Sequence, residues 1–240
     1  MTMMLSLWLR RTLASLAGIA GGRTDEAARV NKRSVEVRPT SIGNLLIGSA
    51  ILLPLAVAVG IWLENPWWQV LHVPASVYDW GVIVAAAAVG AAMGWLPWRF
   101  QELHAVRAFD FDWALKPLAA IEPSHRNIAL LSMFAGVFEE LLFRAALQPV
   151  IGLVPAALLF ALVHASTVRF APSRTQAAAY FAIIVTIGLL LGWVFDTFGL
   201  WAAIALHGVY DYVALRLWAP QIVAERARLW ANFKQGPGSS

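Results

Sequence analysis

The sequence contains no cysteine, which excludes disulfide bonds, thiolate metal sites and cysteine nucleophiles. It also has little charge: 13% of its residues are Asp, Glu, Lys or Arg, whereas soluble domains have roughly 25%. The zinc-binding motif H-E-x-x-H is absent, and we find no internal repeat, direct or inverted. Apolar sequence dominates instead, since 60% of the residues are hydrophobic. The composition therefore predicts an integral membrane protein.

Six apolar stretches are long enough, or nearly so, to cross a membrane as helices. They cover about 43–63, 78–98, 127–148, 154–168, 177–196 and 199–218. No segment between them is large enough to act as a separate soluble domain. We therefore expect an all-α fold, a polytopic membrane helix bundle of about six transmembrane helices.

The Lys and Arg residues alternate between the predicted loops. Seven lie in 1–42, none in 64–77, four in 99–126, none in 149–155, two in 169–176, none in the next turn and four towards the C-terminus. Because cytoplasmic loops are enriched in these residues, both termini are predicted to be cytoplasmic. The net charge of +4 resides in these loops, so we expect no nucleic-acid partner.

The stretches divide the chain into four parts. Residues 1–42 are a cytoplasmic segment that can hold an interfacial helix, and we expect no signal-peptide cleavage there. Residues 43–125 contain two transmembrane helices and a connection whose Trp113 suggests that this connection lies on the membrane surface. Trp67 and Trp68, in the loop between the two helices, are also expected to lie at the membrane interface. Residues 126–218 form a four-helix core. Residues 219–240 are a cytoplasmic tail, expected to be disordered.

Three ionisable residues stand within six positions of the third stretch: Glu139, Glu140 and Arg144. A charge near the middle of a bilayer costs roughly 2.5–3.5 kcal/mol, so these groups must pair or line a wet cavity. On a helix Glu140 and Arg144 are at i,i+4 and share a face, which predicts a structural pair. Glu139 is rotated by about 100° from Glu140 and is left unpaired, so it is a candidate general base.

Two more stretches carry polar residues at a similar depth. His164 lies in the fourth, and His207 and Asp211 lie at i,i+4 in the sixth. With a rise of ~1.5 Å per residue, their heights overlap that of Glu139 in the middle and outer half of the membrane. Each group alone could be a satisfied buried side chain, but their joint occurrence indicates a single site. Apart from Asp196 at its end, the fifth stretch contains only apolar residues, Thr186 and glycines, and we interpret it as scaffold.

These residues form three motifs that resemble those of the CAAX protease and bacteriocin-processing family of intramembrane endopeptidases. The motifs are Glu139-Glu140-x-x-x-Arg144, Phe160-x-x-x-His164 and His207-x-x-x-Asp211. The resemblance covers about 126–218 and implies that this core is catalytic.

The resemblance also implies a role for each motif residue. Glu139 with His164 would activate a water molecule, and His207 with Asp211 would position that water or stabilise the oxyanion. Glu140 and Arg144 would support the helix that presents Glu139. Phe160 would support the site as well.

Other interpretations of the same residues remain open. Glu139, His164 and His207 could bind zinc, although we predict no cofactor. The chain could instead be a non-catalytic immunity or interaction protein, or a proton-coupled transporter with these groups as a relay. On the protease interpretation the partners are the lipid bilayer and a protein or peptide that enters from the membrane. The expected location is a bacterial inner membrane.

Overall fold

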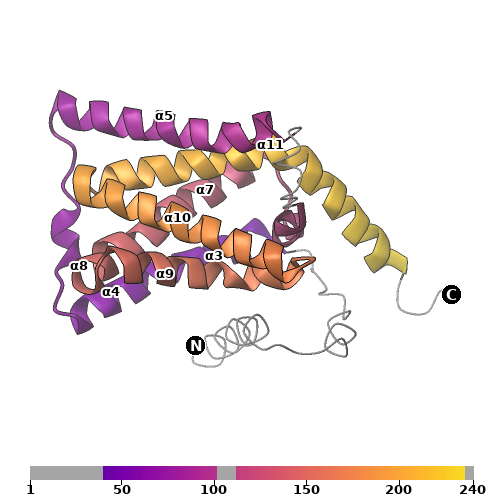
Figure 1. Ribbon diagram of the computed structural model, residues 1–240, viewed down its shortest axis with the longest axis horizontal. Helices are drawn as coiled ribbons and strands as arrows, with labels where there is room; N and C mark the ends of the chain where they lie inside the picture. Colours follow the sequence, from indigo (N-terminus) through magenta and orange to yellow (C-terminus); the bar gives the residue numbers. More distant parts are fainter. Residues whose placement is uncertain (1–39, 102–111, 236–240) are drawn as a thin grey trace.

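Figure 1 shows the computed structural model of the chain, which describes residues 40–101 and 112–235. The described residues are almost all helical and contain no strand, so the predicted all-α fold is confirmed. In chain order the elements are α3 (Ile42–Ala50), α4 (Leu52–Trp62), η1 (Trp67–Val70), α5 (Val77–Arg99), η2 (Asp112–Ala120), α7 (His125–Glu140), η3 (Leu141–Leu147), α8 (Gln148–Ile151), α9 (Leu153–His164), η4 (Ala165–Phe170), α10 (Arg174–Phe198) and α11 (Leu200–Gln235). Of the η elements, η3 is a π-helix and the others are 3-10 helices.

Polar caps and glycines set where the helices begin and turn. Serine side chains accept a hydrogen bond from the first turn of a helix at Ser41, Ser76, Ser124 and Ser173. The reversals from α8 to α9 and from α10 to α11 each pass through one glycine, at φ 86° for Gly152 and 85° for Gly199. Side chains with a Cβ rarely adopt this conformation, so glycine permits turns this short.

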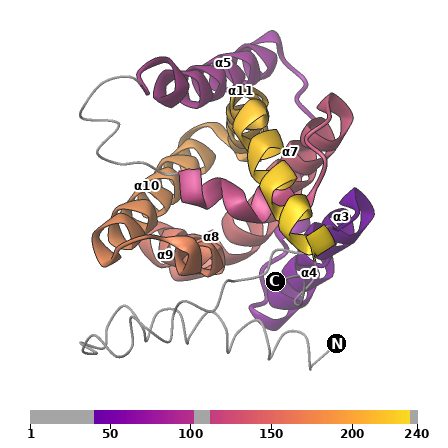
Figure 2. The same cartoon turned by 90° about the vertical axis from the view of Figure 1, so that its right-hand side faces the viewer.

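The two ends of the bundle differ in charge. The connections without Lys or Arg, which follow α4, α8 and α10, lie at the left of Figure 1. The right-hand end carries η2, η4 and the adjoining helix termini, with Arg99, Lys116, Arg169 and Arg174. The end-on view in Figure 2 shows η2 lying across this end, between α10 and α11. The alternation of basic residues along the sequence therefore corresponds to two opposite ends of one bundle.

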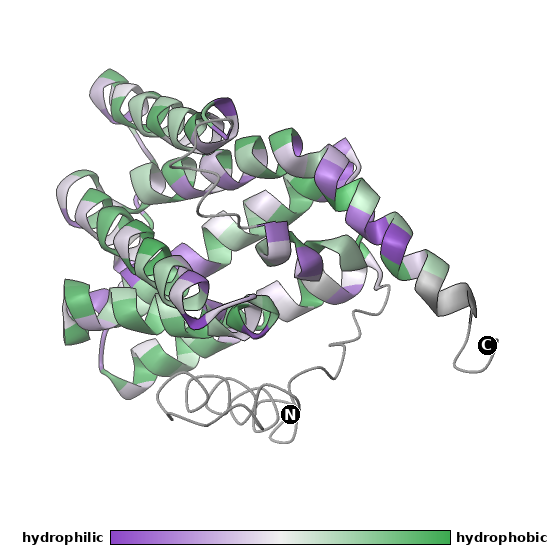
Figure 3. Ribbon diagram, turned by 45° about the vertical axis from the view of Figure 1, so that its right-hand side comes forward, coloured by the Kyte–Doolittle hydropathy of each residue, from purple (hydrophilic) through white to green (hydrophobic). Residues whose placement is uncertain are grey.

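Four helical segments are long and apolar enough to span a membrane: Ile42–Trp62, Val77–Arg99, Leu153–Phe170 and Arg174–Phe198. The ribbons of the bundle are largely green in Figure 3, the colour of apolar residues, and large apolar side chains such as Ile61 and Trp62 are 65% and 80% exposed. Apolar surface of this kind is stable against lipid and not against water. The protein is an integral membrane protein.

The third and sixth predicted spans are not among these four. Residues 127–148 are divided between α7, η3 and α8, because the regular helix ends at Glu140 and a π-helix follows. Apart from Gly199, residues 199–218 lie in α11, whose polar residues lower its hydropathy. These are the two stretches that carry most of the ionisable residues of the candidate site. The count of six spans stays a prediction.

Three expectations from the sequence are wrong. The chain after Pro220 is not disordered, because α11 continues to Gln235, and helix-favouring residues such as Ala224, Glu225 and Arg226 follow the proline. Trp67 is not an interfacial anchor, since it is 5% exposed and donates to the carbonyl of Ala56. Trp113 does not lie on the membrane, because it too is 5% exposed.

Trp113 packs against the ring of Tyr180, with 5.3 Å between the ring centroids. Most of the predicted N-terminal segment 1–42, with its interfacial helix, and residues 236–240 of the tail lie outside the described residues.

Helix α5 packs closely along α11, and glycines make this approach possible. Gly90 and Gly94 form a G-x-x-x-G pattern, which is typical of close helix contacts in membranes. A Cβ on Gly90 would collide with the carbonyl oxygen of Leu206 in α11. Leu206 directly precedes His207, so this contact fixes α11 at the height of the candidate site.

We expect Gly90→Ala to destabilise the protein by about 1–3 kcal/mol, because the added methyl group must push α5 away from backbone atoms of α11. Thermal unfolding of the purified protein in detergent measures the effect. Gly81→Ala is the matched control, since nothing lies within 4 Å of the added atom on the same helix. Equal melting temperatures for the two variants would contradict the close contact.

Candidate active site

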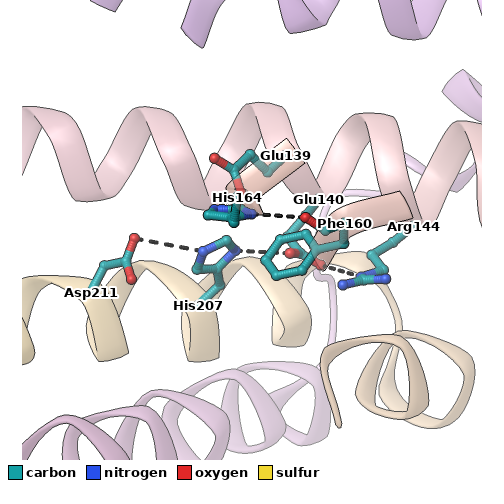
Figure 4. Close-up of polar contacts among 7 residues, drawn as sticks. All are labelled: Glu139, Glu140, Arg144, Phe160, His164, His207 and Asp211. Atoms are coloured by element: carbon teal, nitrogen blue, oxygen red, sulfur yellow. Dashed lines mark hydrogen bonds and ion pairs between the residues drawn. The ribbon is translucent and has the colours of Figure 1, made fainter. Parts of the chain in front are cut away.

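The candidate site lies where α7, α9 and α11 meet. Glu139 and Glu140 are the last two residues of α7, His164 is the last residue of α9, and His207 lies in the second turn of α11. The two glutamates approach α11 because glycines face each other one turn earlier. A Cβ on Gly136 would lie 3.0 Å from the Cα atom of Gly208. Figure 4 shows the side chains that result from this meeting.

Glu140 is the centre of a buried ionic group. Its Oε2 lies 3.2 Å from Nε of Arg144, and both side chains are fully buried, so the predicted i,i+4 pair is confirmed. Its Oε1 accepts a hydrogen bond of 2.8 Å from Nδ1 of His207. The sequence analysis did not predict this second bond. Glu140 therefore connects the α7 motif to the α11 motif.

Phe160 lies between the basic groups of the site. The Arg144 guanidinium stands 5.1 Å from its ring centroid, a cation–π distance. Its ring centroid is 4.7 Å from that of His164 and 5.9 Å from that of His207. Among the described residues, neither terminal nitrogen of Arg144 has a hydrogen-bond partner, so the aromatic face is the main contact of that end of the cation. This packing limits how far each of the three side chains can turn.

Glu139 faces His164 across a short gap. Oε2 of Glu139 lies 3.7 Å from Nε2 of His164, and the two side chains are 17% and 30% exposed. Nδ1 of His164 lies 2.8 Å from the carbonyl oxygen of Phe160. A carbonyl can only accept, so Nδ1 carries a proton, and the Nε2 of a neutral ring turns its lone pair towards Glu139.

Asp211 completes the row of polar side chains in Figure 4. Its Oδ2 lies 3.6 Å from Nε2 of His207, and the carboxylate is 27% exposed. The His207 ring thus has a carboxylate on each side: Glu140, which is buried, and Asp211, which is more accessible. A ring in this setting can hold a proton on both nitrogens.

A cavity of about 830 Å³ brings the more exposed groups together. Its wall includes Glu139, His164, His207 and Asp211, while Glu140 and Arg144 lie behind it. Apolar residues such as Leu131, Ile184, Leu215 and Trp218 form much of the remaining wall. The cavity continues to the basic end of the bundle, where Gln101, Asp112 and Gln221 line it.

The comparison with known families points to the same segment. Residues 123–213 match a family model described as type II CAAX prenyl endopeptidase Rce1-like. This segment belongs to the CAAX protease family. The match begins just before α7 and ends within α11, so it contains all seven residues of Figure 4. No curated protein and no solved structure gives a significant match to the chain.

The resemblance inferred from the three motifs is thus confirmed for residues 123–213, and the matched family is one of endopeptidases. Helices α3, α4 and α5 lie before the matched segment. They nevertheless contact it, as the packing of α5 on α11 shows.

Two tyrosines of the CAAX protease segment also line the cavity, and the sequence analysis missed them. Tyr180 comes from α10, which had been interpreted as scaffold, and Tyr210 precedes Asp211 on α11. Tyrosine is common at membrane interfaces, so its presence in a span carries little signal. The available signal was the position of Tyr180, which lies near the basic end of α10.

A zinc site made of Glu139, His164 and His207 does not fit this geometry. The part of the chain that the structure describes contains no group of three His, Asp or Glu side chains arranged to hold a metal ion. Nδ1 of His207 is directed to Glu140, and its Nε2 faces Asp211. We therefore derive no reaction step through a metal.

Proposed function

We propose that this protein is an intramembrane endopeptidase in which Glu139 is the general base. One observation carries the proposal: of the two adjacent glutamates, Glu140 is occupied by Arg144 and His207, whereas Glu139 faces the cavity beside His164. The carboxylate of Glu140 is held by its partners, whereas that of Glu139 is accessible to a reactant. This division of roles suits a support and a base.

In the proposed reaction a water molecule is activated between Glu139 and His164. The carboxylate of Glu139 and the unprotonated Nε2 of His164 both accept hydrogen bonds, and their separation of 3.7 Å is too long for a direct bond. The water oxygen bonds to the peptide carbonyl carbon while Glu139 takes the water proton. When the C–N bond breaks, Glu139 passes that proton to the leaving amine, so the carboxylate is restored.

His207 and Asp211 act on the oxyanion. In this proposal the His207 ring is protonated on both nitrogens, so that Nδ1 donates to Glu140 and Nε2 can donate towards the cavity. Such a donor stabilises the negative oxygen of the tetrahedral intermediate. Asp211 balances the charge of the ring from the other side, at 3.6 Å. Glu140, Arg144 and Phe160 hold the ring and the end of α7 in place.

The substrate is a protein or peptide that enters from the membrane. The apolar wall of the cavity suits a hydrophobic segment, and the proposed reaction is maturation or C-terminal sorting-type processing of that substrate. With both termini on the cytoplasmic side of a bacterial inner membrane, the basic end of the bundle faces the cytoplasm. The cavity continues to that end, so we propose that the hydrophilic part of the substrate lies there.

The test compares purified protein with and without a chelator on a reconstituted membrane-peptide library, with the products identified by mass spectrometry. We expect cleaved peptides, activity that survives chelation, and no stoichiometric metal by elemental analysis. A zinc peptidase run in parallel is the control for the chelator. Stoichiometric zinc together with zinc-restored activity would overturn the glutamate mechanism. Proton flux without any cleaved product would indicate the transporter instead.

A further inference from the structure

The loop that follows α4 is folded against the bundle. The backbone N–H of Asn65 donates to the carbonyl of Gly60 at 2.8 Å, and that of Trp67 donates to the carbonyl of Asn65 at 2.8 Å. The indole of Trp67 donates to the carbonyl of Ala56 at 3.0 Å. These bonds give the loop a fixed shape, and they direct the side chain of Asn65 towards the protein interior.

The amide of Asn65 reaches the π-helix η3, which directly follows the two glutamates. Its Nδ2 lies 3.0 Å from the carbonyl oxygen of Ala145 and 3.0 Å from that of Ala146. The –NH2 group has two hydrogens, so it can donate one to each carbonyl. Eighty residues of sequence separate Asn65 from Ala145, so this contact is purely tertiary.

The sequence explains why the carbonyl of Ala145 needs an outside donor. In an α-helix the carbonyl of Ala145 would accept from residue 149, but this residue is Pro149, which has no N–H. The π-helix that precedes the proline also departs from the α-helical pattern of bonds. A buried carbonyl without a partner is unfavourable, and Asn65 removes that defect at the end of η3.

We propose that Asn65 is a positioning residue of the site, which fixes the end of η3 and thereby the residues that η3 holds. Ala145 follows Arg144, whose guanidinium binds Glu140, and Glu140 binds His207. Movement of η3 would pass along this chain of contacts to the end of α7, where Glu139 lies. Asn65 stands outside the matched segment 123–213. The kinetic consequence rests on the proposed function, whereas the structural consequence does not.

Two substitutions remove the donor. Asn65→Ala deletes the side chain, and Asn65→Asp keeps its size but has only acceptor oxygens. We expect both to lower kcat about tenfold or more with KM changed less than about threefold, because a small misplacement of the base slows the chemical step more than binding. Asn65→Gln, which retains the amide, is expected to recover a large part of kcat.

Hydrogen–deuterium exchange of the same proteins reads the structure directly and needs no substrate. We expect peptides that cover 141–151 to exchange about tenfold faster in Asn65→Ala and Asn65→Asp than in the parent. Peptides from α9 should exchange at the parental rate. This measurement decides the anchoring role even if the parent cleaves no peptide, in which case only the proposed function fails.

Two matched controls come from the same loop. Gln69 is an exposed amide in η1, and Gln69→Ala should change neither exchange nor kcat. Trp67→Phe removes the bond to Ala56 and loosens the loop without touching the η3 carbonyls. Compared with the Asn65 variants at the same loss of stability, Trp67→Phe therefore shows how much kcat is lost through reduced stability alone. If Asn65→Ala does not accumulate, Asn65→Ser, a milder loss of the amide, is measured in its place.

Unchanged exchange of 141–151 in the donor-free variants would overturn the proposal. So would a loss of kcat no greater than that of Trp67→Phe at the same loss of stability. Recovery in Asn65→Gln but not in Asn65→Asp would tie the effect to the donated hydrogen bonds.

Discussion

Glu139→Gln protein is expected to fold like the parent and to lose peptide cleavage by about a hundredfold to ten-thousandfold. The glutamine keeps the shape of the side chain but cannot take a proton from water. Glu139 makes no buried ion pair like that of Glu140, so its charge contributes little to folding. Single-turnover cleavage, normalised to protein that elutes as a monodisperse peak and melts like the parent, measures the loss.

Glu122→Gln is the matched control, because Glu122 is exposed and lies outside the cavity. It should retain full activity. A Glu139→Gln protein with more than a tenth of the parental rate would remove Glu139 from the role of base. Loss of activity together with loss of bound zinc would instead reassign it as a metal ligand.

Arg144→Ala is expected to lower the free energy of unfolding by about 3–5 kcal/mol, since it leaves the carboxylate of Glu140 buried without its cation. Folded yield and melting temperature should both fall. Combining Arg144→Met with Glu140→Gln removes both charges and should recover much of the folded yield. Activity should not recover, because the charged partner of His207 is gone.

The control for this pair is Arg228→Ala. Arg228 lies 3.6 Å from Glu225 but its side chain is 79% exposed, and surface pairs of this kind contribute about 0–1 kcal/mol. The melting temperature of the Arg228→Ala protein should stay close to that of the parent. If Arg144→Ala accumulates and melts like Arg228→Ala, the buried pair is not a support of the fold.

The sequence predicted the pairings that depend on local spacing. Glu140 and Arg144 meet because an i,i+4 separation brings side chains together, and this held although α7 passes into a π-helix between them. The depth argument anticipated that the polar side chains of three helices would lie close together, and they line one cavity. Spacing and depth are properties of single helices, so one sequence is enough to estimate them.

Contacts between distant segments could not be predicted in the same way. The bond between Glu140 and His207 depends on how α7 and α11 are rotated about their axes, which no local pattern specifies. The buried positions of Trp67 and Trp113 depend on how their loops fold back on the helices. Tryptophan suits both a membrane interface and a protein core, so composition alone favoured the wrong environment.

The site contains six ionisable side chains. Three are acids and three are bases: Glu139, Glu140 and Asp211, with Arg144, His164 and His207. In a medium of low dielectric constant the creation of a new charge is unfavourable, whereas the displacement of an existing one over a short distance is much less so. When Glu139 takes a proton in the proposed reaction, the negative charge passes to the substrate oxygen a few ångströms away. The membrane interior therefore contains as many charges during the reaction as before it, and hydrolysis there becomes a redistribution of charge within one group of atoms.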